Sequence, residues 1–183
     1  MGFIQSSKHQ MRVKRSTPNL VTTGADEALP YLTSNIFSHK FKGKKGKVLD
    51  VTQDYIVYQD SDTKEVDYIS IKENVMKNSD GGFFVSVKLS PNVKKGQTLH
   101  YNDILAYDKT SYSKAIGTEA SDGHISYNSG TMIKLGVIPT DEAYEDSSII
   151  TESLSDSLTT EYLVKKDRYI AKDSNLYQIV SPG

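Results

Sequence analysis

Hydrophobic and polar residues alternate along the middle of the chain, a pattern typical of half-buried β-strands. The clearest example is residues 83–89 (FFVSVKL), where one face would carry Phe83, Val85, Val87 and Leu89. Three other short segments are rich in β-branched and aromatic residues: 47–51, 54–59 and 66–71. The polar residues 60–65 (DSDTKE) lie between the last two and predict a turn, so we expect a hairpin or meander here.

The second half of the chain continues this pattern with longer interruptions. Pro91 ends the strand at 83–89, Gly96 marks a turn, and residues 103–108 (DILAYD) predict a further strand. Residues 109–130 are polar and rich in turn-forming residues, which predicts a long surface loop with one short strand at 124–127.

The last part of the pattern completes the expected fold class. Residues 131–139 (TMIKLGVIP) predict a strand ended by Pro139, and the best helical candidate is the short segment 152–158. We therefore expect a mainly β protein, a barrel-like or sandwich domain of short strands with long loops and little helix.

The composition is that of one globular domain without disulfides. The chain has 183 residues, of which 37% are hydrophobic and 25% are charged, within the usual range for a single folded domain. No apolar run approaches the roughly 20 residues of a membrane-spanning helix. Cysteine is absent, which excludes thiolate zinc sites and cysteine nucleophiles. The start of the chain lacks an apolar core with a cleavage site, so we expect no signal-peptide secretion and no membrane partner.

Positive charge is concentrated near the start of the chain. Residues 1–50 hold nine Lys or Arg and three Asp or Glu, whereas the remaining residues hold 13 and 20. The basic side chains form two runs: Lys8, Arg12, Lys14 and Arg15, then Lys40, Lys42, Lys44, Lys45 and Lys47. Such runs can neutralise phosphates, so these nine residues are candidate nucleic-acid contacts. A solvated basic turn between two strands is the alternative interpretation.

The sequence lacks the usual catalytic signatures. It contains no phosphate-binding glycine loop, no dinucleotide fingerprint and no Gly-x-Ser-x-Gly elbow. The four histidines are scattered without the spacing of metal ligands, and the twelve tyrosines fit strand faces better than base stacking. The adjacent carboxylates of Glu145 and Asp146 remain as candidates for metal chemistry, and the alternative is that they cap or flank the segment that follows.

Several stretches resemble one family when they are taken in order. "MGFIQ" is similar to a Met-Gly-x-x-Met-Gln stretch without its second Met, and "PNLVTTGADEAL" is similar to a Pro-Leu-Val-Gly-Thr-Gly-Met-Glu motif. "GKVLDVTQDYIVYQ" resembles a Gly-Val-Val strand pair, and "VKKGQTLHYNDILAYD" resembles a turn motif in which Asn102 stands where Gly is usual. Next, "TMIKLGVIP" is similar to an apolar strand that ends in a proline, and "AYEDSSIITESL" is similar to the Tyr-Glu-Asp motif that follows that strand. In this order and spacing, residues 1–165 resemble the part of the bacterial-type multisubunit RNA polymerase β subunit that leads into its hybrid-binding region.

The resemblance implies a role for the acidic pair but no enzyme in this chain alone. In the family the Tyr-Glu-Asp motif lies near the incoming nucleotide and the second magnesium ion, which makes Glu145 and Asp146 candidate metal ligands. The principal magnesium ion is held by an aspartate triad on another subunit, and neither that triad nor the family's Arg-His-Gly-Asn-Lys-Gly segment occurs here. Asp141 and Glu142 make the loop more anionic than in the family. We therefore expect no catalytic residue, and Mg²⁺ binding only together with partner subunits.

Two functions follow from the resemblance. In the first, the protein is a non-catalytic fragment of the β-subunit type that acts only within a larger assembly with polymerase subunits. In the second, it is a phage virion protein, a capsid or tail component, that reuses the fold without transcription. Both predict obligate association with other chains, because strands cut from a barrel leave unpaired edges, and both place the protein in the host cytoplasm or the virion. We expect a domain at 1–165, with a basic part at 1–50, and a tail at 166–183 that forms an extended or docking strand.

Overall fold

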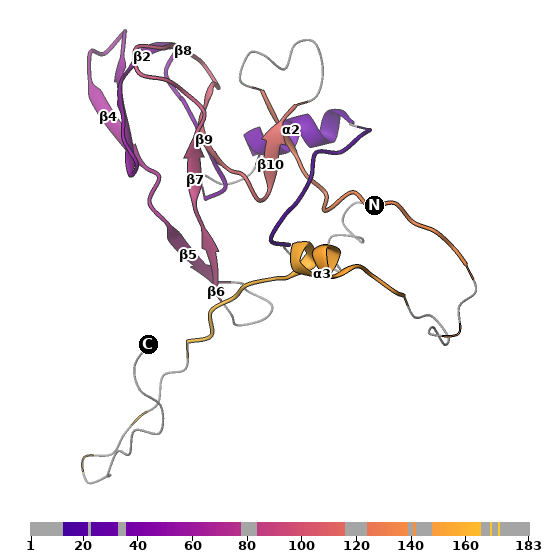
Figure 1. Ribbon diagram of the computed structural model, residues 1–183. Helices are drawn as coiled ribbons and strands as arrows, with labels where there is room; N and C mark the ends of the chain where they lie inside the picture. Colours follow the sequence, from indigo (N-terminus) through magenta and orange to yellow (C-terminus); the bar gives the residue numbers. More distant parts are fainter. Residues whose placement is uncertain are drawn as a thin grey trace.

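The described part of the protein is built mainly of antiparallel β-strands. The computed structural model describes residues 13–21, 23–32, 36–77, 84–115, 124–138, 141, 148–165, 169 and 172. These residues contain eleven strands and two short helices, and every strand pair is antiparallel. The predicted mainly β, sandwich-like fold with little helix is therefore confirmed (Figure 1).

The largest sheet is the predicted meander with one added strand. Its strands, in spatial order, are β4 (Val66–Ser70), β3 (Tyr55–Asp60), β2 (Lys45–Val51) and β8 (Thr98–His100). Along β2, exposed and buried residues alternate from Lys45 to Leu49, as expected for a sheet with one solvated face. The register shifts between Val48 and Asp50, which is a β-bulge.

A second sheet packs against the buried face of the first. Its strands, in spatial order, are β1 (Ser38–Lys40), β9 (Ile104–Asp108) and β7 (Leu89–Pro91). All five residues of β9 are buried, which explains why this predicted strand reads as apolar rather than alternating. The main hydrophobic core lies between the two sheets: Phe41, Val48, Ile56, Ile69, Ile71, Val87, Leu89, Val93, Leu99, Leu105 and Ala106.

Two hairpins and a helix complete the β domain. The hairpins are β5 (Asn74–Lys77) with β6 (Phe84–Val87), and β10 (Tyr112–Lys114) with β11 (Ile125–Tyr127). Helix α2 (Gly24–Leu32) lies close to β11, and a smaller apolar cluster there includes Tyr112 and Ile125. The predicted loop at 109–130 was therefore partly wrong, because Tyr112 is 2% exposed and belongs to a paired strand. Helix α2 was not predicted.

The two ends of the described chain are held together. Lys14 N donates to the carbonyl of Thr159 at 2.8 Å, and Leu163 forms an isolated antiparallel bridge with Phe84 of β6. Between these contacts lies helix α3 (Glu152–Leu158), which the sequence predicted over the same residues. Its first turn is capped by the Thr151 side chain, which accepts from Leu154 N at 3.2 Å.

One predicted strand is not formed. Residues 131–138 are extended but pair with no strand of the described chain, so the prediction of a strand at 131–139 was wrong for this structure. The reason is physical, because an alternating apolar segment becomes a strand only beside a partner edge. Pro139 and most of the expected tail at 166–183 lie outside the described residues.

Within the described ranges, neither helix has the length and apolar character needed to cross a membrane.

Candidate nucleic-acid interface

The basic run at 40–47 forms the turn into β2 and the start of that strand. Phe41 anchors the turn, since its ring is 1% exposed and lies in the main core. The ring comes so close to the backbone that a Cβ on Gly43 or Gly46 would lie 2.6 Å from Phe41 Cζ. The two glycines therefore allow Phe41 to fold under the turn. Lys42 and Lys44, which lie on either side of Gly43 in this turn, remain exposed.

Lys45 and Lys47 lie on the solvated face of the four-stranded sheet, which we call the outer face. Lys45 is opposite His100 of β8, and Lys47 lies between Thr98 of β8 and Gln59 of β3. Side chains directly across an antiparallel pair share a face. Among the described residues, no carboxylate forms an ion pair with Lys45 or Lys47, so both ammonium groups can meet an external anion.

Two tyrosines extend this face on β3 and β4. Tyr55 and Tyr68 meet edge to face, with ring centroids 5.7 Å apart and planes at 71°. Tyr68 is 62% exposed, so its ring is accessible to a ligand on this face. Exposed rings on a β-sheet are the platform on which unpaired bases stack.

Lys72 adds a cation beside these rings. Its Nζ lies 4.9 Å from the Tyr55 ring centroid, a distance at which a cation is attracted by the face of an aromatic ring. The same Nζ lies 3.8 Å from Asp54 Oδ2. A hydrogen bond with Tyr55, with a smaller effect of the Asp54 carboxylate, raises the pKa of Lys72 above its ordinary value. The Asp54 carboxylate compensates part of the Lys72 charge. The outer face therefore combines Lys45 and Lys47, which have no ion pair among the described residues, with Lys72 and two aromatic rings.

Lys40 is not part of this face. Its Nζ donates to the carbonyl of Tyr31, in the last turn of α2, and the side chain is half-buried. Since α2 has no basic residue in its own last turn, Lys40 satisfies a carbonyl at the helix C-terminus. Its role in the structure is to join β1 to α2.

Lys14 and Arg15 form ion pairs with residues near helix α3 and are not part of the outer face. Lys14 Nζ lies 3.4 Å from Asp156 Oδ1 and 3.7 Å from Glu161 Oε1, and the Arg15 guanidinium lies 3.6 Å from Asp156 Oδ2. Part of the positive charge of the first basic run is thus compensated within the chain. Lys8 and Arg12 lie outside the described residues.

The candidate metal ligands Glu145 and Asp146 also lie outside the described residues. Within the described ranges, no group of three or more His, Asp or Glu side chains has the arrangement of a metal site.

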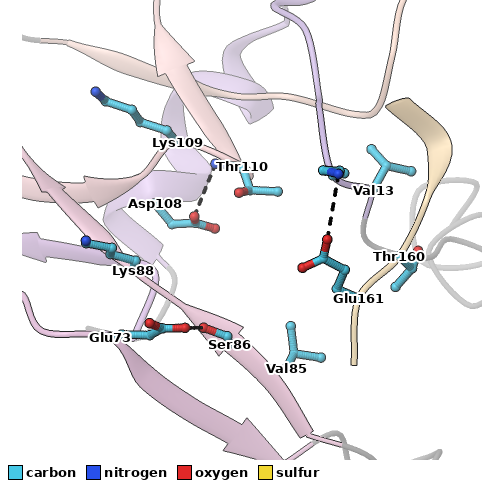
Figure 2. A pocket seen from close by; sticks show the side chains of 11 residues that line it. Val13, Glu73, Val85, Ser86, Lys88, Asp108, Lys109, Thr110, Thr160 and Glu161 are labelled. Carbon is cyan, nitrogen blue, oxygen red and sulfur yellow. Dashed lines mark hydrogen bonds and ion pairs between the residues drawn. The ribbon is translucent and has the colours of Figure 1, made fainter. Parts of the chain in front are cut away.

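A cavity of about 290 Å³ lies between β6, the turn after β9 and the segments 13–14 and 160–161 (Figure 2). Its carboxylates already have partners. Asp108 Oδ1 accepts from Thr110 N at 3.1 Å, Glu73 accepts from the Ser86 hydroxyl, and Glu161 faces Lys14. Since three carboxylates line the cavity and would repel an anion, the cavity is less suited than the outer face to an anionic ligand.

Comparison of the sequence with models of known protein families gives no match, and a search of curated proteins finds no significant relative.

Sequence reasoning found only part of the outer face. It selected Lys45 and Lys47 but assigned the tyrosines to ordinary strand faces, and Lys72 was not considered. A signal was available in the alternation of the two strands. It places Tyr55 with Val57 and Gln59, and Tyr68 with Val66 and Ser70, on faces opposite the buried Ile56 and Ile69.

Proposed function

We propose that the protein is a non-catalytic component of a multi-chain assembly and that its outer face binds single-stranded or unpaired nucleic acid. The observation that carries the proposal is that Lys45, Lys47 and Lys72 lie on the same solvated sheet face as the rings of Tyr55 and Tyr68, with Lys72 beside the Tyr55 ring. Lysines supply salt-dependent attraction to phosphates, and the exposed ring of Tyr68 supplies stacking that does not depend on sequence.

The geometry favours unpaired bases over an intact duplex. A tyrosine ring stacks on a base only when that base is exposed, and bases inside a helix are covered by their neighbours. The outer face is a sheet surface rather than a helix or ribbon that would enter a major groove. We therefore expect single strands to bind more tightly than duplexes of equal charge density.

The resemblance to the polymerase β subunit supports a finer version of the proposal. In that version the assembly is of the polymerase type, and the Mg²⁺ near Glu145 and Asp146 would be held together with partner subunits. A capsid or tail component of a phage virion is the second candidate. The exposed apolar side chains at 132–138 support the contacts between chains that either assembly requires.

The test of nucleic-acid binding is a titration of labelled single-stranded DNA and RNA, and of an RNA·DNA hybrid, at several salt concentrations. Replacing Lys45 and Lys47 by Ser should lower the affinity for single strands at least tenfold at low salt. The slope of log K against log salt should fall by about 1.4, since each phosphate contact on a single strand contributes about 0.7.

The matched control replaces Lys88 and Lys109 by Ser, which removes the same charge. These exposed lysines line the cavity of Figure 2 rather than the outer face. An equal loss of affinity in both double variants would show that only net charge matters, and absence of binding by the unmodified protein at low salt would contradict the proposal outright.

The finer alternatives are separated by identifying the proteins that copurify with the native chain. Polymerase subunits that carry an aspartate triad would support the first version, whereas capsid or tail proteins would support the second.

A further inference from the structure

Residues 131–138 form an extended arm that carries the side-chain pattern of a β-strand but has no strand beside it. Ile133, Leu135 and Val137 alternate along one side, and Leu135 and Val137 are 82% and 91% exposed. The base of the arm is fixed, because Met132 N donates to the Thr17 hydroxyl at 2.7 Å. Aliphatic side chains that are exposed together in this way mark a surface for association.

The same chain also has an unfilled strand edge. β4 is the terminal strand of its sheet, and β3 is its only partner among the described strands. Tyr68 N donates to the Asp67 side chain at 2.7 Å rather than to a neighbouring strand, so this amide points to the open edge. Val66 and Tyr68 on the outer face of β4 are 59% and 62% exposed.

We propose that the arm of one copy of this chain adds as an antiparallel strand to the β4 edge of a second copy. The proposal does not depend on nucleic-acid binding. Strand addition of this kind pairs the backbone groups of an open edge and places alternate side chains against its faces.

Charge and apolar character select one register. When Lys134 is opposite Asp67 of the second copy, the only charged side chain of the arm meets a carboxylate. In the same register Ile133 lies opposite Tyr68 and Leu135 lies opposite Val66, so the exposed apolar side chains of donor and acceptor share one face. A shift by one residue would place Lys134 against an apolar neighbour and break both matches.

The acceptor must belong to another copy. Figure 1 shows the arm and β4 on opposite sides of the molecule, far from one another. A donor on one side and an acceptor on the other make a head-to-tail contact, which generates rings or open chains of subunits rather than a simple twofold dimer. We therefore expect species larger than a dimer as the protein concentration rises.

The register can be tested by disulfide cross-linking, because the natural sequence contains no cysteine. Equal amounts of the Asp67→Cys and Lys134→Cys variants, mixed and mildly oxidised, should give a covalent heterodimer, since paired residues bring their Cα atoms within bonding range. The off-register pair Ser70→Cys with Lys134→Cys should not, because three residues displace the Cα atoms by about 10 Å. Equal cross-linking of both pairs would overturn the proposed register.

The association itself can be tested by sedimentation velocity across micromolar concentrations. The Leu135→Asp/Val137→Asp variant should remain a monomer where the unmodified protein associates. The matched control is Leu20→Asp/Val21→Asp, whose positions are 77% and 82% exposed elsewhere on the surface, and it should associate as the unmodified protein does. A purified unmodified chain that stays monomeric throughout, or a control that also dissociates, would overturn the proposal.

Discussion

The ring of Phe41 meets the ring of Tyr58 edge to face, with centroids 5.5 Å apart and planes at 89°. Tyr58 in turn donates its hydroxyl hydrogen to Asp67 Oδ2 at 3.1 Å, and burial together with this bond raises the pKa of Tyr58 to about 12. The hydroxyl therefore stays protonated at any physiological pH. This pair of rings joins the basic turn to β3 and so sets the position of the outer face.

The Phe41 ring predicts a cost for any side chain at Gly46. A Cβ there would lie 2.6 Å from Phe41 Cζ and 2.9 Å from the Gln59 carbonyl, and the ring itself is buried in the main core. We expect Gly46→Ala to lower the free energy of unfolding by about 1–3 kcal/mol, as measured by urea denaturation. Gly136→Ala is the control, because nothing lies within 4 Å of its Cβ. An equal urea midpoint for both variants would refute the close packing.

His39 predicts a loss of stability in mild acid. Burial, and to a lesser degree the nearby Lys42, lowers the pKa of His39 below its ordinary value. The unfolded chain therefore takes up a proton near pH 6.5 that the folded chain resists, and stability falls as pH drops below about 6.5 until the lowered folded pKa is passed.

The comparison that isolates this effect uses thermal unfolding at pH 7.5 and pH 5. His39→Gln should reduce the difference in Tm between the two conditions, whereas His100→Gln, at a site whose side chain is 70% exposed, should retain it. If the two variants behave alike, the acid sensitivity comes from other groups.

Loss of the N-cap of helix α3 should destabilise the helix locally without lowering the stability of the whole protein. None of its residues is buried, so the Thr151 cap and the backbone bonds to Lys14 and Arg15 hold it in place. Thr151→Ala should destabilise the helix by about 0.5–2 kcal/mol. Amide hydrogen exchange should then rise at 152–158, while the global urea midpoint stays nearly constant.

An alanine inside the same helix is the control for that measurement. Ser155→Ala replaces an exposed residue by a better helix former, so exchange at 152–158 should stay equal or slow. Faster exchange in this variant would mean that serine contacts, rather than the cap, hold the helix.

The exposed ring of Tyr68 should contribute a component of nucleic-acid binding that salt does not remove. Tyr68→Ala should weaken single-strand binding at high salt, where phosphate contacts are screened, because stacking on a ring contributes about 1–3 kcal/mol per base. Fluorescence anisotropy at high salt measures this effect. Tyr169→Ala, at a fully exposed position away from the sheet, should bind as the unmodified protein does, and an equal loss in both would exclude stacking on the outer face.

The sequence alone was sufficient where local pattern and final structure agree. Alternation predicted the meander of β2, β3 and β4, because a period of two places one side of each strand in the core. The helix at 152–158 was also predicted, since its cap is local. Positive charge identified Lys45 and Lys47, because the strand period keeps both on the solvated side.

Long-range contacts decided the rest. Tyr112 looked like a loop residue because its neighbours are polar. It forms a strand because Tyr127, fifteen positions later, pairs with it, and it packs in a buried cluster with Ile125. Lys14 and Lys40 looked like members of a phosphate-binding set until the fold placed Asp156 and the Tyr31 carbonyl against them. Asp156 lies 142 positions from Lys14, and a backbone carbonyl such as that of Tyr31 has no residue type that would mark it, so neither partner leaves a local signal.

The sequence by itself determined which segments can be strands, because the side-chain period of two is a property of neighbouring residues. Only the tertiary structure decided which strands find a partner. Register brought Tyr55 and Tyr68 together with the lysines on one face, whereas residues 131–138, with an equally good strand pattern, pair with no described strand of their own chain. Backbone pairing requires two segments, and the position of the second is a property of the folded chain or of its assembly.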